Sequence, residues 1–259
     1  MAATGERSER RRRPSSNPLL LLAEGRALFE AVTLLPAAPV LLSAPSGDGH
    51  HVVVIPPFGA GDAFTTVLRG YLSQRGYRTH KWDRREVLGL HRLVTVALTR
   101  LAEVTARSGG KVSVIGHSLG GIYAREIARA APEHVRMVIT VGSPFAGDLK
   151  SNYVWPMYEA VTGTPIDTIP TRFLEQMNEP TGVPSTALYS KTDGVASWTC
   201  CVEQETPLTE NIEVYGSHIG LLHNPMVLYL IAERLAQPEG EWTKFTPTGL
   251  AARVFRTDG

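Results

Sequence analysis

The sequence lacks the features of a disulfide-stabilised or metal-binding protein. It has two cysteines in 259 residues, and these two, Cys200 and Cys201, are adjacent. Neighbouring cysteines on an ordinary trans backbone rarely bond to each other, and no zinc-ligand spacing surrounds this pair. We therefore expect two small apolar side chains, buried or half-buried, with neither a disulfide nor a metal at this position.

Long apolar runs are also absent. The run Leu19–Leu22 is followed by Glu24 and Arg26, so it is shorter than the roughly 7–15 apolar residues at the centre of a secretory signal. No stretch approaches the roughly 20 apolar residues that cross a bilayer. On this basis we expect a soluble, cytoplasmic protein with no integral membrane segment.

Charge of one sign is not in excess, because the formal net charge is +1. This balance argues against nucleic acid as a partner of the folded part. A local basic cluster, Arg7 and Arg10–Arg13, precedes Pro14. We interpret residues 1–17 as a disordered, solvated tail in preference to a contact with nucleic acid or an anionic membrane.

The sequence does contain short apolar runs that alternate with amphipathic stretches. Runs such as Val52–Ile55 are typical of strands that are covered on both faces. The alternation predicts an α/β fold, with a mostly parallel sheet and helices on both faces. We expect strands at 52–55, 77–82, 112–115, 135–141, 185–189 and 212–215, and helices at 62–75, 90–106, about 121–131 and 226–236.

Three segments fall outside this alternation. Residues 18–50 predict a helix to about Leu35 and then a proline-containing connector. Residues 148–183 are rich in aromatic side chains and methionine and predict a small cap inserted over the sheet, with a packed side subdomain that does not contact the substrate as the alternative. Residues 239–259 form a C-terminal extension, so the main domain spans about 51–238, a size that suits a single α/β unit.

The strongest chemical signal is the G-x-S-x-G pattern of Gly116-His117-Ser118-Leu119-Gly120. It lies between an apolar strand and an alanine-rich helix, the context in which such a serine stands exposed on a sharp turn. Glycines on both sides would avoid clashes there, and Gly121 would let the helix pack closely. We predict that Ser118 is a nucleophile.

A serine hydroxyl needs a base and an orienting acid, which follow the nucleophile in the order acid and then histidine in this kind of fold. Asp193 follows one predicted strand and precedes Gly194, which would permit a tight turn. His218 follows the next strand, and we prefer it to His223, which lies near a helix start. Asp148 and Asp167 are alternatives to Asp193, but both belong to the inserted segment.

An oxyanion hole needs two backbone N–H groups. One is expected from Leu119, directly after the nucleophile. The other is expected from the loop after the first strand, where Pro56 and Pro57 have no N–H, so that Phe58 is the first donor. Gly59 is the alternative.

Four segments together resemble the bacterial lipase and esterase branch of the α/β-hydrolase family. They are Ile55-Pro56-Pro57-Phe58-Gly59, Gly116-His117-Ser118-Leu119-Gly120-Gly121, Ser190-Lys191-Thr192-Asp193-Gly194 and Gly216-Ser217-His218-Ile219-Gly220. The resemblance covers about residues 51–235. It implies Ser118 as nucleophile, Asp193 as acid and His218 as base. Relatives usually carry glycine where this chain has Pro57.

These observations predict hydrolysis of small carboxylic esters with an apolar acyl group, without a cofactor or metal. We expect Phe58, His117, Trp155 and Phe173 to contact the substrate. A thioesterase or amidase would use the same three residues, so the sequence does not separate these activities. A non-catalytic binding protein on the same fold is a further alternative.

Overall fold

The structure is a computed structural model that describes residues 17–57, 59–83, 90–147, 152–163, 165–247 and 256–257. The expectations for the tail at 1–16, for Phe58 and for Asp148 lie outside the described residues. So does most of the C-terminal extension beyond residue 247.

Seven strands of the described chain form one sheet in the order β2-β1-β3-β4-β5-β6-β7. Neighbouring strands are parallel, except that β7 pairs with β6 in the antiparallel direction. The predicted α/β class with a mostly parallel sheet is therefore confirmed. The strands are β1 (His51–Ile55), β2 (Arg78–His80), β3 (Val112–His117), β4 (Val135–Val141), β5 (Ser185–Tyr189), β6 (Thr209–Glu213) and β7 (Arg256–Thr257).

Strand order reverses between β1 and β3, because the chain leaves β1 for β2 on one side and returns to β3 on the other. The loops that follow β1 and β3 consequently diverge. In open α/β sheets, such a divergence at the carboxyl ends of the strands opens the crevice where ligands bind. The predicted nucleophile follows β3, so the topology places it at this crevice.

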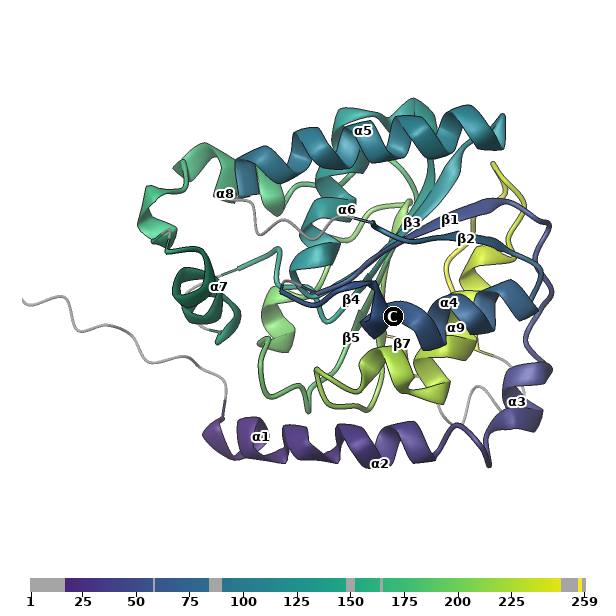
Figure 1. Cartoon of the computed structure of the whole chain (residues 1–259), viewed down its shortest axis with the longest axis horizontal. Helices are drawn as coiled ribbons and strands as arrows, with labels where there is room; N and C mark the ends of the chain where they lie inside the picture. The colour runs from purple at the N-terminus through teal and green to yellow at the C-terminus, as the bar shows by residue number, and fades with distance from the viewer. Residues whose placement is uncertain are drawn as a thin grey trace, which may run out of the picture.

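Helices cover both faces of the sheet, with α5 and α6 on one side and α4 and α9 on the other (Figure 1). Two further helices, α7 and α8, lie to the left of the sheet in Figure 1, and the N-terminal segment runs along the bottom. The helices are α1 (Pro18–Leu22), α2 (Ala27–Val32), α3 (Ala38–Leu42), α4 (Thr66–Gln74), α5 (Leu90–Ser108), α6 (Leu119–Ala130), α7 (Val154–Thr162), α8 (Thr171–Met177) and α9 (Pro225–Leu235).

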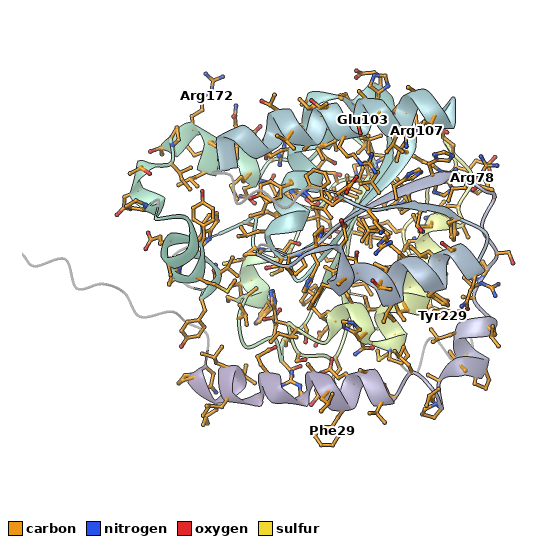
Figure 2. The ribbon with its side chains drawn as sticks, in the orientation of Figure 1. Phe29, Arg78, Glu103, Arg107, Arg172 and Tyr229 are labelled. Atoms are coloured by element: carbon orange, nitrogen blue, oxygen red, sulfur yellow. The ribbon has the colours of Figure 1, made fainter. Side chains whose placement is uncertain are left out.

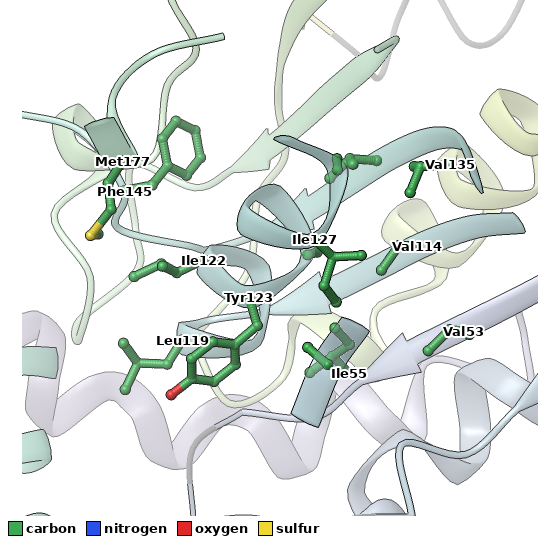
Figure 3. Packing of buried hydrophobic residues seen from close by; sticks show 14 of the residues in the cluster. Val53, Ile55, Val114, Leu119, Ile122, Tyr123, Ile127, Val135, Phe145 and Met177 are labelled. Atoms are coloured by element: carbon green, nitrogen blue, oxygen red, sulfur yellow. The ribbon is translucent and has the colours of Figure 1, made fainter. Parts of the chain in front are cut away.

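Alternating side chains of β1 divide the core into two layers. Val53 and Ile55 pack with α6 (Figure 3) and also with α5, whereas Val52 and Val54 pack with α4 and α9. All four are at most 2% exposed. Full burial of one such side chain stabilises a fold by about 1.5–3 kcal/mol, which explains why this run forms an inner strand.

The N-terminal segment differs from the single helix expected to Leu35. It forms α1, a 3-10 turn over Ala23–Arg26 and then α2, so that the helix is interrupted around Gly25. Glycine is among the poorest helix formers, and Glu24 turns inward and is buried at this point. The expected connector also contains a short helix, α3, whose Pro39 occupies the first turn.

The last parallel strand begins at Thr209, three residues before the predicted start at Ile212. The residues before Ile212 are polar, so they form no apolar run that would indicate a strand. Glu210 is nevertheless buried, because its carboxylate accepts hydrogen bonds from Thr186 Oγ1 (2.6 Å) and Arg234 Nη1 (3.2 Å). Paired in this way, a charged side chain can lie inside the fold.

Candidate active site

Ser118 stands on the sharp turn between β3, which ends at His117, and α6, which begins at Leu119. Its backbone has φ 55° and ψ −127°, a left-handed conformation that a residue with a Cβ rarely adopts. The Ser118 N–H donates to the Val141 carbonyl of β4 at 2.9 Å. Neighbouring β4 therefore helps to hold a strained turn, a feature that clusters at functional sites.

Glycines around this turn allow three backbone segments to meet. A Cβ at Gly116 would lie 2.2 Å from the Gly120 carbonyl oxygen, and a Cβ at Gly120 would lie 2.5 Å from the Pro56 carbonyl oxygen. A Cβ at Gly121 would meet the Ser143 hydroxyl oxygen at 2.0 Å. The glycines expected from the motif are thus required by close approach of the backbone.

His218 lies between Ser118 and Asp193. Its Nε2 is 3.0 Å from Ser118 Oγ, and its Nδ1 is 2.6 Å from Asp193 Oδ2. All three residues are at most 5% exposed. The structure therefore brings the three predicted site residues into one hydrogen-bonded chain, from loops that follow β3, β5 and β6.

The orientation of Asp193 is fixed by its second oxygen. Oδ1 accepts hydrogen bonds from the N–H groups of Val195 (2.8 Å) and Ala196 (2.7 Å). Oδ2 is thereby directed at His218 Nδ1. Because a carboxylate accepts the Nδ1 proton, Nε2 is the nitrogen left to accept the proton of Ser118.

Burial and charge act in opposite directions on His218. Burial disfavours the positively charged ring, but the adjacent Asp193 carboxylate favours it, with a smaller contribution from Glu24. The net effect raises the pKa of His218 above its usual 6.5. A base with a raised pKa accepts a proton more readily.

His117 is buried and does not face solvent. Its Nε2 donates to the His218 carbonyl oxygen at 2.9 Å, and its ring stacks on Phe64 with centroids 5.7 Å apart. Burial, reinforced by the nearby His218 charge, holds the pKa of His117 well below 6.5, so the ring is neutral. We expected His117 to contact the substrate, but this geometry favours a role in supporting the His218 loop.

The alternatives for base and acid lie elsewhere. The His223 ring packs edge-on against Phe64, with centroids 5.5 Å apart, and Asp167 is exposed.

Leu119 opens α6, so its N–H belongs to the first turn, where N–H groups have no carbonyl partner within the helix. Of the other predicted contacts, Trp155 is 1% exposed within the core, whereas Phe173 is only partly buried.

Two acidic residues of the N-terminal segment, which were not among the predicted site residues, bond to the loops that carry Asp193 and His218. Glu24 accepts from the N–H groups of Gly194 (2.8 Å), His218 (3.0 Å) and Ile219 (3.0 Å). Glu30 accepts from the Ser217 N–H at 2.8 Å. The only sequence signal was a pair of acidic residues within an otherwise apolar stretch, and a pair of this kind usually lies in solvent.

The chain belongs to the alpha/beta hydrolase family, whose profile matches residues 21–254. Among solved structures, the fold is similar to Aspergillus fumigatus lipase B, with a TM-score of 0.58 and 15% identity over 77% of this chain and 56% of that chain. It is also similar to a Paleococcus ferrophilus monoacylglycerol lipase, with a TM-score of 0.56 and 15% identity over 74% of this chain and 96% of that chain. At these identities the likeness concerns the fold.

A shorter stretch is similar to curated triacylglycerol lipases. It is 40% identical over 58 residues to the enzymes of Pseudarthrobacter phenanthrenivorans and Burkholderia plantarii. The match covers 22% of this chain and only 18% and 16% of those proteins. Together with the family match, it supports a hydrolase.

Cys200 and Cys201 are both buried, as predicted. Among the residues that the structure describes, no group of three histidine, cysteine or acidic side chains could hold a metal ion. In the same part of the chain, no helix has the length and apolar character needed to span a bilayer.

Proposed function

We propose that the protein hydrolyses carboxylic esters with an apolar acyl group, through an acyl-enzyme on Ser118. The observation that carries this proposal is the chain of hydrogen bonds from Ser118 Oγ to His218 Nε2 and from Nδ1 to Asp193, built on a strained turn. This arrangement activates a serine that is a poor nucleophile on its own.

In the first half-reaction, Ser118 Oγ attacks the ester carbonyl carbon while His218 Nε2 takes the hydroxyl proton. The tetrahedral intermediate then collapses, and the imidazolium returns the proton to the departing alcohol oxygen. In the second half-reaction, water attacks the acyl-enzyme, His218 takes a water proton, and Ser118 recovers it as the acid leaves. Asp193 stabilises the imidazolium in both.

Negative charge on the carbonyl oxygen requires two N–H donors in the crevice. We assign the first to Leu119, at the start of α6, and the second to the loop after β1. In that loop we propose Phe58, with Gly59 as the alternative. Pro57 supports a fixed loop, since its carbonyl oxygen accepts from the Ala60 N–H at 3.1 Å.

The acyl group would extend toward the inserted segment that contains α7 and α8. This segment begins beside the acid loop, where the Tyr153 N–H donates to the Val195 carbonyl oxygen at 2.9 Å. Trp155 is packed into the core against Tyr158, with ring centroids 5.7 Å apart. The partly buried Phe173 is therefore the better placed of the two predicted aromatic contacts.

The test is covalent labelling by a fluorophosphonate, followed by turnover of p-nitrophenyl esters of increasing chain length. Ser118→Ala should lose labelling and lower turnover by about four to six orders of magnitude. Ser73→Ala, on the exposed face of α4, is the matched control and should keep both. Near-normal turnover by Ser118→Ala would refute the mechanism. Labelling without ester turnover, but with turnover of thioesters, would change the substrate class.

A further inference from the structure

One buried carboxylate joins the two loops that carry the proposed acid and base. Glu24 Oε1 accepts from the N–H of Gly194, next to Asp193, and also from the N–H of His218 itself. Its Oε2 accepts from the Ile219 N–H. The two loops are 25 residues apart in the chain, and this single side chain bonds to both.

Two glycines in these loops leave room for the N-terminal segment to pack against them. A Cβ at Gly194 would lie 2.3 Å from the Leu20 carbonyl oxygen, so the backbone of α1 lies directly on the acid loop. A Cβ at Gly220 would lie 2.1 Å from Glu30 Oε2. Gly194 has no positive φ, so close approach of α1, and not the tight turn that we expected, explains glycine after Asp193.

The charge of Glu24 is held by backbone groups. Within the described chain, Arg26 forms its ion pair with Glu30, at 3.4 Å, and donates to the Thr192 carbonyl oxygen at 2.5 Å. A carboxylate that is bonded to neutral N–H groups keeps its full negative charge. In a buried region, where the effective dielectric constant is low, that charge acts strongly on its neighbours.

We propose that Glu24 is a positioning residue of the active site, which fixes the Asp193 and His218 loops relative to each other and stabilises the His218 imidazolium. This inference rests on the proposed function, since it assigns a role within the same reaction. The other charged or titratable groups around His218 lie on several elements: Asp193 after β5, His117 at the end of β3, Glu30 and Arg26 on the N-terminal segment, and His223 before α9.

The test compares three variants by their pH profiles of kcat/KM on a soluble short-chain p-nitrophenyl ester. Glu24→Gln keeps the shape of the side chain and removes its negative charge, which stabilises the His218 imidazolium. The pKa of His218 should therefore fall, and the acid limb of the kcat/KM profile should move to lower pH by more than the fitting error. We expect kcat to fall by about 10- to 100-fold, the scale of effect of a small displacement of catalytic groups. Glu24→Asp keeps the charge and shortens the side chain, so kcat should fall while the acid limb stays near that of the wild type.

Glu133→Gln is the matched control. It also removes one negative charge, but at an exposed site before β4, at the opposite end of the strands. Its profile should match the wild type. An unshifted acid limb in Glu24→Gln, with folding intact by circular dichroism, would overturn the proposal. If Glu24→Gln fails to fold, an acid limb in Glu24→Asp that moves to lower pH would overturn it as well.

Failure of the proposed function gives a different result. In that case the wild type itself neither labels with fluorophosphonate nor hydrolyses esters. An active wild type with insensitive Glu24 variants would refute the positioning role alone.

A second, independent observation concerns the outer face of the same N-terminal segment. Figure 2 shows Phe29 at the edge of the molecule, pointing away from it. Leu22 is 81% exposed, Phe29 76% and Leu35 84%. The exposed large apolar residues of this segment are Leu19, Leu21, Leu22, Leu28, Phe29, Val32, Leu35, Val40 and Leu42. Such a concentration marks a surface that binds something apolar.

The sequence directly before this segment is basic. Residues 1–16 hold five arginines against two glutamates and, after Met1, no large apolar side chain. Those residues are therefore poorly suited to cover the apolar face. In a dimer formed through this face, the arginines of two copies would repel each other, whereas anionic lipid headgroups would attract them.

We propose that this face docks on an anionic lipid surface, with its apolar side chains at the acyl boundary. Amphipathic segments with basic flanks bind membranes in this manner. The proposal replaces the expectation that the arginines contact only solvent, because that expectation did not include the exposed apolar face.

Vesicle flotation tests this second proposal, using phosphatidylcholine vesicles with and without phosphatidylglycerol. The full chain should float only with phosphatidylglycerol, and salt should weaken this binding. The double variant Leu22→Ser, Phe29→Ser should lose at least about tenfold in affinity, since two of the apolar side chains that would enter the lipid become polar. Leu208→Ser, at another exposed leucine, is the control.

Ester turnover in solution should be unchanged in the double variant. Absence of flotation, or flotation that the double variant leaves intact, would overturn the proposal. A wild-type dimer on size-exclusion chromatography that the double variant dissociates would also overturn it, in favour of a second copy of the chain.

Discussion

Substitution of Gly120 tests how closely the turn at Ser118 is packed. A Cβ at Gly120 would lie 2.5 Å from the Pro56 carbonyl oxygen and 2.7 Å from that of Ile55. The first contact must lengthen by 0.5 Å merely to reach 3.0 Å, below which real Cβ contacts essentially do not occur. Both neighbours are backbone atoms at the end of β1, so a side-chain rotation cannot relieve the clash, and the turn must move away from the proposed oxyanion loop.

The expected magnitude of the Gly120→Ala effect follows from this displacement. Overpacking costs about 1–3 kcal/mol of stability, while alanine in a helix contributes up to about 1 kcal/mol in its favour. A displacement of catalytic groups by about 1 Å can lower the rate by about 10²-fold. The shift expected here is about half as large, so we expect kcat to fall by about tenfold.

Gly70→Ala is the control, because Gly70 lies in α4 and a Cβ there would meet nothing within 4 Å. It should stabilise the protein by about 0.5–1 kcal/mol and leave kcat unchanged. Chemical denaturation and p-nitrophenyl ester turnover provide the two measurements. If Gly120→Ala matches Gly70→Ala in both, the reasoning about close approach is wrong.

Further predictions concern the acid, the base, the pH profile and the inserted segment. Asp193→Asn should lower kcat by about 10⁴-fold through the wrong tautomer of His218, and a loss below about tenfold would exclude Asp193 as the acid. His218→Ala should abolish turnover while His223→Ala keeps most of it, and the reverse would reassign the base. Since the pKa of His218 is raised, kcat/KM should fall as pH drops through a value above 6.5, and an acid limb below 6.5 would contradict this. Phe173→Ser should change the preferred acyl-chain length, whereas a uniform loss of stability with unchanged preference would indicate packing alone.

The sheet and the sharp turn at Ser118 could be predicted from the sequence because each leaves a local signal. The strands at Val135–Val141 and Ser185–Tyr189 are found with the predicted bounds. The turn at Ser118 combines a strand, a helix and glycines within a few residues. Where polar residues enter a strand, as at Thr209 and Glu210, the boundary was wrong, because burial there depends on a partner distant in sequence.

The role of the N-terminal segment could not be predicted for a related reason. Glu24 meets Gly194 and His218 only after the sheet has brought the ends of β5 and β6 together, 170 and 194 residues further along the chain. In the sequence, Glu24 merely interrupts an apolar run, which argued against a secretory signal. No local pattern distinguishes an acidic residue that caps buried loops from one that faces water.

The two halves of the proposed site are thus held by different means. Ser118 is fixed by the sheet itself, because its N–H bonds to β4 and Gly120 packs on the end of β1. Asp193 and His218 lie on loops beyond the strands, and N–H groups of both loops donate hydrogen bonds to the buried Glu24 carboxylate. A change at the turn should therefore affect stability and turnover together, because it strains the sheet. A change of charge at Glu24 should instead appear in the pH profile, because it alters the field at His218 while the packing around Ser118 remains.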